Sequence, residues 1–337
     1  MPDATPTSTA PPSPARRNKG WVAVQVVLTA VILWFVAKGL LEEWRKFREQ
    51  PSVELHPRWA IIALSCVIIL ATYVVLVETW RRMIVAWGET LSFSDAAHIW
   101  FVSNLARYLP GVNQVATLGA VAELSRRRSV SPIAAAGASV INTAVNIATG
   151  FVIALLGGFS ALNAVSSGHA TLGLWVAVVL LGGLLLLPTI LPWVLGTAQR
   201  VTGRQFGIRS LPQRAMYISL VGNLVAWAMY GLAFEFFVRG MLGHAVGGTL
   251  DYVALWAAAY VIGYLAVLLP AGIGVREAAL IDGLTLLKLT TAGPAGVIAF
   301  AARLWLTVLE IAPALIYLAR GARRRPQDTT PRDGTIP

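Results

Sequence analysis

Two short segments combine helix-breaking residues with charged side chains inside an otherwise apolar sequence. One runs Asn104-Leu-Ala-Arg-Tyr-Leu-Pro-Gly111, and the other runs Leu268-Leu-Pro-Ala-Gly-Ile-Gly-Val-Arg-Glu277. A helix interrupted at membrane depth leaves backbone N–H and C=O groups that lipid cannot satisfy. Such a break is tolerated only where protein packs around it or where it lines a wet cavity. The two segments therefore indicate where a polar substrate binds within a membrane protein.

The basic and glycine residues of these segments suit an anionic lipid headgroup. Arg107 comes just before Pro110 and Gly111. Its planar guanidinium can bind a lipid phosphate, or it can snorkel to the membrane interface. Gly272 and Gly274 free the backbone beside Pro270. Successive N–H groups at the start of the following helix can then form an anion-binding nest, to which Arg276 adds positive charge.

Acidic residues complete the expected site. Glu277 falls in the first turn of the helix after the second break. It is either a carboxylate stabilised by the helix N-terminus or a functional group. A functional Glu277 would pair with a cationic headgroup, pair with Arg107, or carry a proton. Arg303 and Glu310 are seven residues apart, so they share a helix face and either line the same path or pair with other helices. The expected substrate-binding residues are Arg107, Pro110, Gly111, Gly272, Gly274, Arg276, Glu277, Arg303 and Glu310.

Composition places the chain in a bilayer. Of 337 residues, 56% are hydrophobic and only 13% are charged, with a mean hydropathy of +0.67. The net charge of +11 comes from Arg clusters between apolar segments, which are typical of orientation signals or of contacts with anionic lipids. We therefore expect no nucleic-acid partner. A single cysteine, Cys66, excludes an internal disulfide and a cysteine-based zinc site. The four dispersed histidines and the absence of a known catalytic motif predict neither a metal, nor a cofactor, nor an enzyme.

The spacing of apolar segments predicts an all-α, polytopic helix bundle. Counting Lys and Arg places both termini in the cytoplasm, with about eight crossings in all. Region 95–124 is expected to be a re-entrant helical hairpin, because a crossing there would put Arg126–Arg128 and the basic loop 200–214 on opposite sides. Residues 19–320 form one membrane domain, and the polar tails 1–18 and 321–337 are expected to be disordered. The predicted crossings are 20–41, 58–80, 132–157, 171–195, 213–238, 251–269, 271–290 and 294–319.

The two broken segments also echo one another. Leu109-Pro110-Gly111 is followed by Glu123, and Leu269-Pro270-Ala271-Gly272 is followed by Glu277. The echo fits either an internal structural repeat, as many transporters have, or a chance recurrence of Leu-Pro pairs.

The same segments resemble a known family. Arg107-Tyr-Leu-Pro-Gly111 and Leu269-Pro-Ala-Gly-Ile-Gly-Val-Arg-Glu-Ala278 are similar to the transmembrane region of bacterial lysylphosphatidylglycerol synthases, over about residues 20–320. This region recurs in stand-alone flippase-like proteins. The resemblance implies a flippase fold in the bacterial plasma (inner) membrane and a role in the cell envelope. In two-domain relatives a soluble aminoacyltransferase domain follows this region. The chain ends soon after its last span, so we expect no synthase activity.

These features predict a carrier for a polar lipid headgroup, with a phospholipid or a polyprenyl-linked lipid as substrate. Two alternatives remain open. The chain could be a membrane-embedded enzyme that modifies a lipid, or a non-transporting partner of an envelope glycosyltransferase or synthase.

Overall fold

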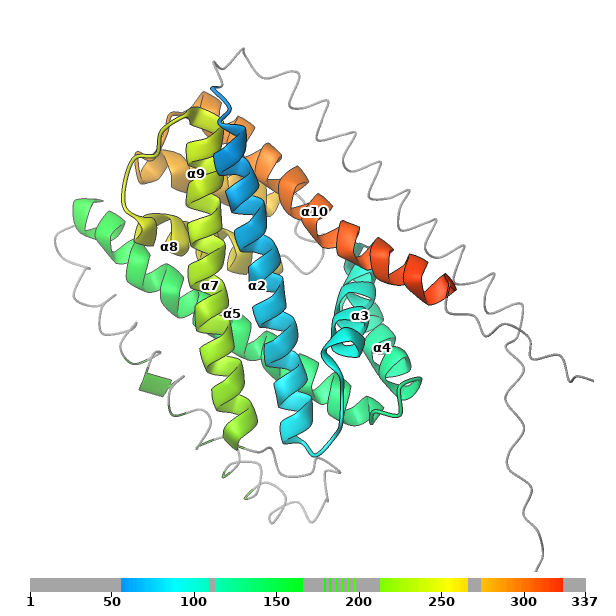
Figure 1. Cartoon of the computed structure of the whole chain (residues 1–337). Helices are drawn as coiled ribbons and strands as arrows, with labels where there is room; N and C mark the ends of the chain where they lie inside the picture. The colour runs from blue at the N-terminus through cyan, green and yellow to red at the C-terminus, as the bar shows by residue number, and fades with distance from the viewer. Residues whose placement is uncertain are drawn as a thin grey trace, which may run out of the picture.

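A computed structural model describes residues 56–108, 113–165, 213–265 and 274–323, together with single positions between 179 and 197. The described residues contain eight α-helices, one 3₁₀ helix and no strand, which confirms the all-α prediction for this part of the chain. The expected span 20–41 and the tail 1–18 lie outside the described residues, as do most of span 171–195 and nearly all of the tail 321–337. In chain order the elements are α2 (Trp59–Ala86), α3 (Phe93–Asn104), η1 (Leu105–Tyr108), α4 (Asn113–Arg126), α5 (Pro132–Val165), α7 (Gln213–Leu242), α8 (Thr249–Leu265), α9 (Val275–Leu286) and α10 (Ala292–Arg323) (Figure 1).

Four of these helices are long and apolar enough to cross a bilayer, namely α2, α5, α7 and α10. Each rises more than about 40 Å at 1.5 Å per residue, whereas the hydrocarbon core measures about 30 Å. Large apolar side chains on their surfaces are exposed, including Val67, Val74, Val221 and Val308. Because water would penalise so many exposed apolar side chains, these faces contact lipid. The chain is therefore a helical membrane protein.

Helices α2 and α7 form the centre of the bundle. They run side by side in opposite directions (Figure 1). A Cβ atom at Gly222 of α7 would overlap the Thr79 side chain of α2, so only glycine permits this close approach. Small residues at such interfaces are typical of membrane helices, which associate by close packing rather than by the hydrophobic effect.

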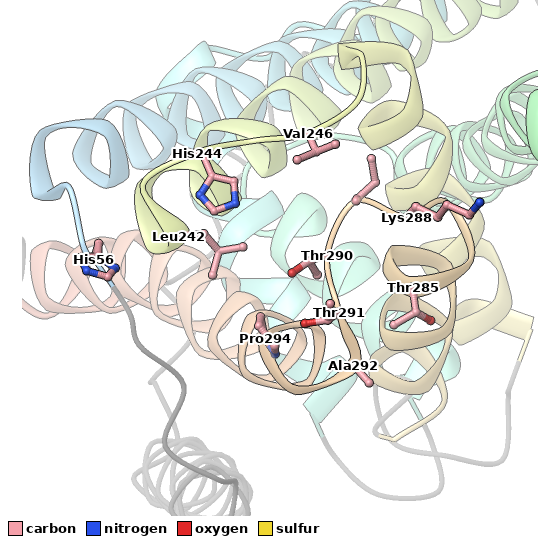
Figure 2. A pocket seen from close by; sticks show the side chains of 11 residues that line it. His56, Leu242, His244, Val246, Thr285, Lys288, Thr290, Thr291, Ala292 and Pro294 are labelled. Atoms are coloured by element: carbon pink, nitrogen blue, oxygen red, sulfur yellow. The ribbon is translucent and has the colours of Figure 1, made fainter.

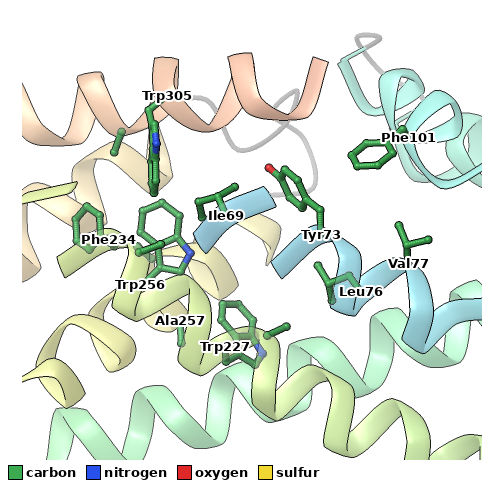
Figure 3. Packing of buried hydrophobic residues seen from close by; sticks show 14 of the residues in the cluster. Ile69, Tyr73, Leu76, Val77, Phe101, Trp227, Phe234, Trp256, Ala257 and Trp305 are labelled. Atoms are coloured by element: carbon green, nitrogen blue, oxygen red, sulfur yellow. The ribbon is translucent and has the colours of Figure 1, made fainter. Parts of the chain in front are cut away.

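Large aromatic side chains fill the space between α7, α8 and α10. Phe234, Trp256 and Trp305 lie together there (Figure 3), and the Phe234 and Trp256 ring centroids are 4.7 Å apart. Trp256 is 1% exposed. Such a cluster holds α8 firmly against α7 and α10, and so fixes the position of the short helix α9 that follows α8.

Asparagine side chains join α5 to α7, as is usual for asparagines in membrane helices. Asn146 Nδ2 donates to Asn223 Oδ1 over 2.7 Å, and Asn223 Nδ2 donates to Asn142 Oδ1 over 2.9 Å. Ser219 Oγ also donates to Asn142 Oδ1, over 2.9 Å. These amides satisfy one another across the helix interface and serve to hold the two helices together.

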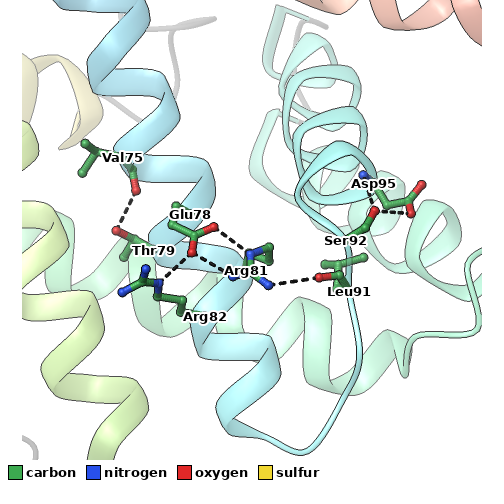
Figure 4. A network of polar contacts seen from close by, with 8 residues as sticks. All are labelled: Val75, Glu78, Thr79, Arg81, Arg82, Leu91, Ser92 and Asp95. Carbon is green, nitrogen blue, oxygen red and sulfur yellow. Dashed lines mark hydrogen bonds and ion pairs between the residues drawn. The ribbon is translucent and has the colours of Figure 1, made fainter.

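Helices α3 and α4 form a hairpin, as the sequence predicts for region 95–124. Asp95, at the start of α3, lies 3.0 Å from Arg128, which follows the end of α4. The segment therefore returns to the end of the bundle from which it departs. That end also carries Arg81 and Arg82 near the C-terminus of α2, and Arg81 donates to the Leu91 carbonyl over 3.2 Å (Figure 4).

Helices α8 and α9 form a second hairpin. Three contacts show that they run in opposite directions along their whole length. A Cβ atom at Gly247 would meet Leu289, one at Gly283 would overlap Leu255, and one at Gly263 would lie 2.9 Å from the Arg276 Cβ atom. The twelve residues of α9 rise only about 18 Å, which is less than the thickness of the hydrocarbon core. The helical part of the expected crossing 271–290 is therefore too short to span alone, and the number of crossings stays a prediction.

Candidate functional site

The second broken segment resumes as a helix at Gly274. This residue has φ +87°, in the left-handed region that glycine adopts without steric cost. Helix α9 begins at the next residue, and Glu277 lies in its first turn. The Gly274 N–H donates to Glu277 Oε2 over 2.7 Å. An acceptor at this position satisfies one of the free N–H groups of the helix start, and its negative charge matches the helix dipole.

Glu277 also forms a buried ion pair. Arg303 Nη1 of α10 lies 3.1 Å from Glu277 Oε1, and the two side chains are 11% and 4% exposed. Arg303 is eleven residues, or about 16 Å, from the start of α10, and so lies well inside a helix long and apolar enough to cross a bilayer. A buried ion pair within such a helix carries a large desolvation cost, which makes it a candidate functional site.

A second guanidinium lies beside this pair. Arg276 is 8% exposed, and its Cζ atom lies 4.3 Å from the ring centroid of Trp256 and 5.5 Å from that of Tyr260. Aromatic faces attract cations most strongly where water is excluded. Gly263 of α8 leaves the room that Arg276 needs, since a Cβ atom there would come within 2.9 Å of the arginine. We call Gly274, Arg276, Glu277 and Arg303 the charged cluster.

Glu310 lies two turns beyond Arg303, about 10 Å further along α10. Its side chain is buried, with 4% exposure. The spacing keeps Glu310 on the face of α10 that carries Arg303, as the sequence predicts. Glu310 therefore extends the buried polar face toward the far end of α10.

The first broken segment is only partly described. The backbone of Arg107 belongs to η1, which continues α3 without a break. The Arg107 side chain, Pro110 and Gly111 lie outside the described residues, as does Gly272 of the second segment. The structure thus brings Gly274, Arg276, Glu277 and Arg303 together, and the substrate-binding roles of all nine residues stay predictions.

The structure shows two interactions of Glu277. Its carboxylate accepts from the Gly274 N–H at the start of α9, which is the stabilisation by a helix N-terminus that the sequence offers as one interpretation. It also pairs with Arg303 of α10. The alternative partner Arg107 and the anion-binding role of the Gly272–Gly274 backbone stay predictions, because the Arg107 side chain and Gly272 lie outside the described residues.

Helix α7 carries a further buried carboxylate. Glu235 is 5% exposed and pairs with Arg239 over 2.8 Å. The i,i+4 spacing of the two residues is that of a local ion pair on one helix face. Burial of Glu235 depends on the packing of α7 against its neighbours, which the spacing does not reveal. The sequence likewise does not predict that Trp256 and Tyr260 lie beside Arg276, because this too depends on packing between helices.

These features define a class of protein: a polytopic helical membrane protein with a buried charged site at an interrupted helix. A family model for the lysylphosphatidylglycerol synthase TM region matches residues 22–310. The chain belongs to this family, and is therefore a membrane protein of a lipid-related family. No curated protein matches the chain.

Proposed function

We propose that the protein carries a polar lipid headgroup between the two leaflets of a bacterial plasma membrane, with both of its termini in the cytoplasm. The buried Glu277–Arg303 pair at the interrupted start of α9 is the observation that carries this proposal. A helix start, two guanidiniums and a carboxylate buried inside a membrane helix bundle carry a large desolvation cost, which packing alone does not explain. They give a headgroup polar contacts while its acyl chains stay in lipid.

Charge at the cluster favours an anionic headgroup. Arg276 and Arg303 outnumber Glu277 at the start of α9, and Glu310 lies about 10 Å further along α10. A phosphate can displace Glu277 from Arg303, because guanidinium forms charge-assisted, bidentate bonds with phosphate as well as with carboxylate.

The first experiment identifies the lipid. Wild type, Glu277→Gln and Glu123→Gln are purified in mild detergent, and the lipids that copurify are determined by mass spectrometry. Glu123→Gln is the matched control, because it removes the same charge from the exposed end of α4. We expect one acidic lipid class to be enriched over the membrane average in wild type and Glu123→Gln, and to be markedly less enriched in Glu277→Gln.

The identified lipid is then reconstituted in proteoliposomes, and its movement between leaflets is measured. Glu277→Gln is expected to abolish this movement without loss of expression, and Arg107→Ala to do the same. Transport retained in both variants would refute the site. A lipid product that disappears on deletion, with leaflet distribution unchanged, would favour an enzyme. A copurifying envelope enzyme with fully active variants would favour an assembly partner.

A further inference from the structure

A cavity opens at the end of the bundle opposite the arginines of α2 and of the α4–α5 turn. Its volume is about 930 Å³, which falls in the range of small-molecule sites. Three connections line it: the α7–α8 loop, the α9–α10 loop and the residue His56 ahead of α2 (Figure 2). The cavity is separate from the charged cluster, and none of the predicted site residues lines it.

The polar lining is rich in hydroxyl and imidazole groups. His56, His244 and Lys288 line the cavity together with Thr285, Thr290 and Thr291. Figure 2 shows the Thr290 and Thr291 hydroxyls on the side that faces Leu242, whereas the Lys288 ammonium is turned toward the outer edge. Imidazole and hydroxyl groups can each donate a hydrogen bond to an anion.

No carboxylate lies among the described residues that line the cavity. Asp251 lies nearby, beside Gly247, and its Oδ2 atom accepts a hydrogen bond from the Gly248 N–H over 2.9 Å. The described residues hold no group of three histidine, cysteine or acidic side chains that could bind a metal ion. The lining therefore favours an anion over a cation.

The start of α10 adds backbone donors to this lining. Thr291 precedes the helix, and its carbonyl accepts from the Ala295 N–H over 3.0 Å. The N–H groups of Ala292 and Gly293 come too early in the helix to find acceptors within it. Free N–H groups and the positive end of the helix dipole favour a phosphate or another anion.

Apolar side chains complete the cavity. Leu242 and Leu289 are buried in its wall, and Val246 and Pro294 also line it. A ligand that combines a phosphate with an apolar portion would find partners for both parts. A phospholipid headgroup with its glycerol and the first carbons of its acyl chains has this composition.

The cavity and the charged cluster lie along the same two helices. Thr285 is eight residues from Glu277 on α9, a rise of about 12 Å, and Thr291 is twelve residues from Arg303, a rise of about 18 Å. The cavity therefore lies at the ends of the two helices that carry the charged cluster.

We infer that this cavity binds the phosphate of a lipid headgroup between His244, Thr290 and the N-terminus of α10, at the membrane surface opposite the arginine clusters. The inference rests on the proposed function for one point, that the phosphate belongs to a lipid. A free phosphate anion would make the same hydrogen bonds in the cavity. The cavity would be a second station for the headgroup, outward from the charged cluster.

Binding is tested without transport, on the full chain purified in a glycosidic detergent free of phospholipid. The probes for calorimetry are dihexanoyl phosphatidylglycerol, dihexanoylglycerol, which lacks the phosphate, and inorganic phosphate. The variants are His244→Gln and Thr290→Val, both in connecting loops, with Arg320→Gln as a control that removes positive charge from the exposed far end of α10. Melting temperatures verify that every variant is folded.

We expect the phospholipid probe to bind at least about tenfold more weakly to His244→Gln and to Thr290→Val, with Arg320→Gln unchanged and dihexanoylglycerol not bound. Equal binding by wild type and both cavity variants would overturn the inference. Inorganic phosphate binding as tightly as the phospholipid would support an anion site but overturn the lipid as its source. Glu277 does not line the cavity, so Glu277→Gln should bind the phospholipid probe as wild type does. This expectation holds even if Glu277→Gln is fully active in transport, so the cavity inference can survive failure of the proposed function.

Discussion

The α3–α4 and α8–α9 hairpins share one plan. Each joins two short helices across an interruption, and each places one of its helices against α10. They differ in where the described charged side chains lie. At α8–α9, Arg276 and Glu277 are buried beside the interruption. At α3–α4, the described charges gather at the open end, where Glu123 pairs with Arg126 and Arg127 at the protein surface.

The two hairpins thus contrast exposed ion pairs with a buried one. Ion pairs at the surface contribute little to stability and are screened by salt. A buried pair carries a desolvation cost that its geometry must offset, so its presence is weak evidence for a stabilising role. The α3–α4 charges lie at the exposed end of their hairpin, whereas those of α8–α9 are buried at the site that we propose for a headgroup. The following predictions test this contrast.

The largest effect is expected for Arg303→Ala. Removing this guanidinium leaves the Glu277 carboxylate buried and without its cation, a change that costs about 3–5 kcal/mol in the free energy of unfolding. Unfolding in detergent measures the loss. The double variant Arg303→Ala/Glu277→Gln should recover much of it, because the uncompensated charge is removed. A double variant no more stable than Arg303→Ala would contradict a coupled pair.

A steric change in the same hairpin should have the next largest effect. Gly283→Ala adds a Cβ atom that overlaps the buried Leu255 side chain of α8. Overpacking of this kind costs about 1–3 kcal/mol. We expect a lower melting temperature and, because α9 is displaced, weaker lipid retention. An unchanged melting temperature would show that α8 and α9 are not tightly packed.

The matching change in the other hairpin should be stabilising. Gly119 of α4 has nothing within 4 Å of the position of an added Cβ atom. Alanine is favoured over glycine in a helix interior by about 0.5–1 kcal/mol. Gly119→Ala should therefore raise the melting temperature, whereas Gly283→Ala lowers it. A fall in both would remove the contrast in packing between the two hairpins.

The smallest effect is expected at the surface of α3–α4. Hydrogen bonds from Arg126 and Arg127 lower the pKa of Glu123 to about 2 from its ordinary value of 4.5. A lowered pKa in the folded state means that the stabilisation is complete above pH 4.5 and is lost as the pH falls toward 2. The side chain is partly exposed, so the pairs are worth only about 0.2–1 kcal/mol.

Melting temperatures of wild type and Glu123→Gln, measured at pH 6 and pH 3, test this expectation. Wild type should be slightly more stable at pH 6, and the difference should shrink at pH 3. A difference that grows on acidification would have the wrong sign for a carboxylate held ionised by two arginines.

Much of the architecture follows from local sequence. Apolar length determines α2, α5, α7 and α10, because each must cover the hydrocarbon core with internally satisfied backbone. The charge rule requires Arg126–Arg128 to lie on the same side as the other arginines, which predicts the α3–α4 hairpin. Gly274 and Glu277 likewise reveal a helix start by their spacing alone.

The tertiary structure decided which residues meet. Nothing local pairs Glu277 with Arg303, which lies 26 residues further along the chain, or places Arg276 over Trp256. The surface cavity is also invisible in the sequence, because His56, His244 and Thr290 come from three separate connections. Helix periodicity specifies faces and lengths, but contacts between helices depend on how several faces pack at once. For this reason the sequence determined the bundle and its breaks, and only the packing of α8, α9 and α10 determined the charged cluster.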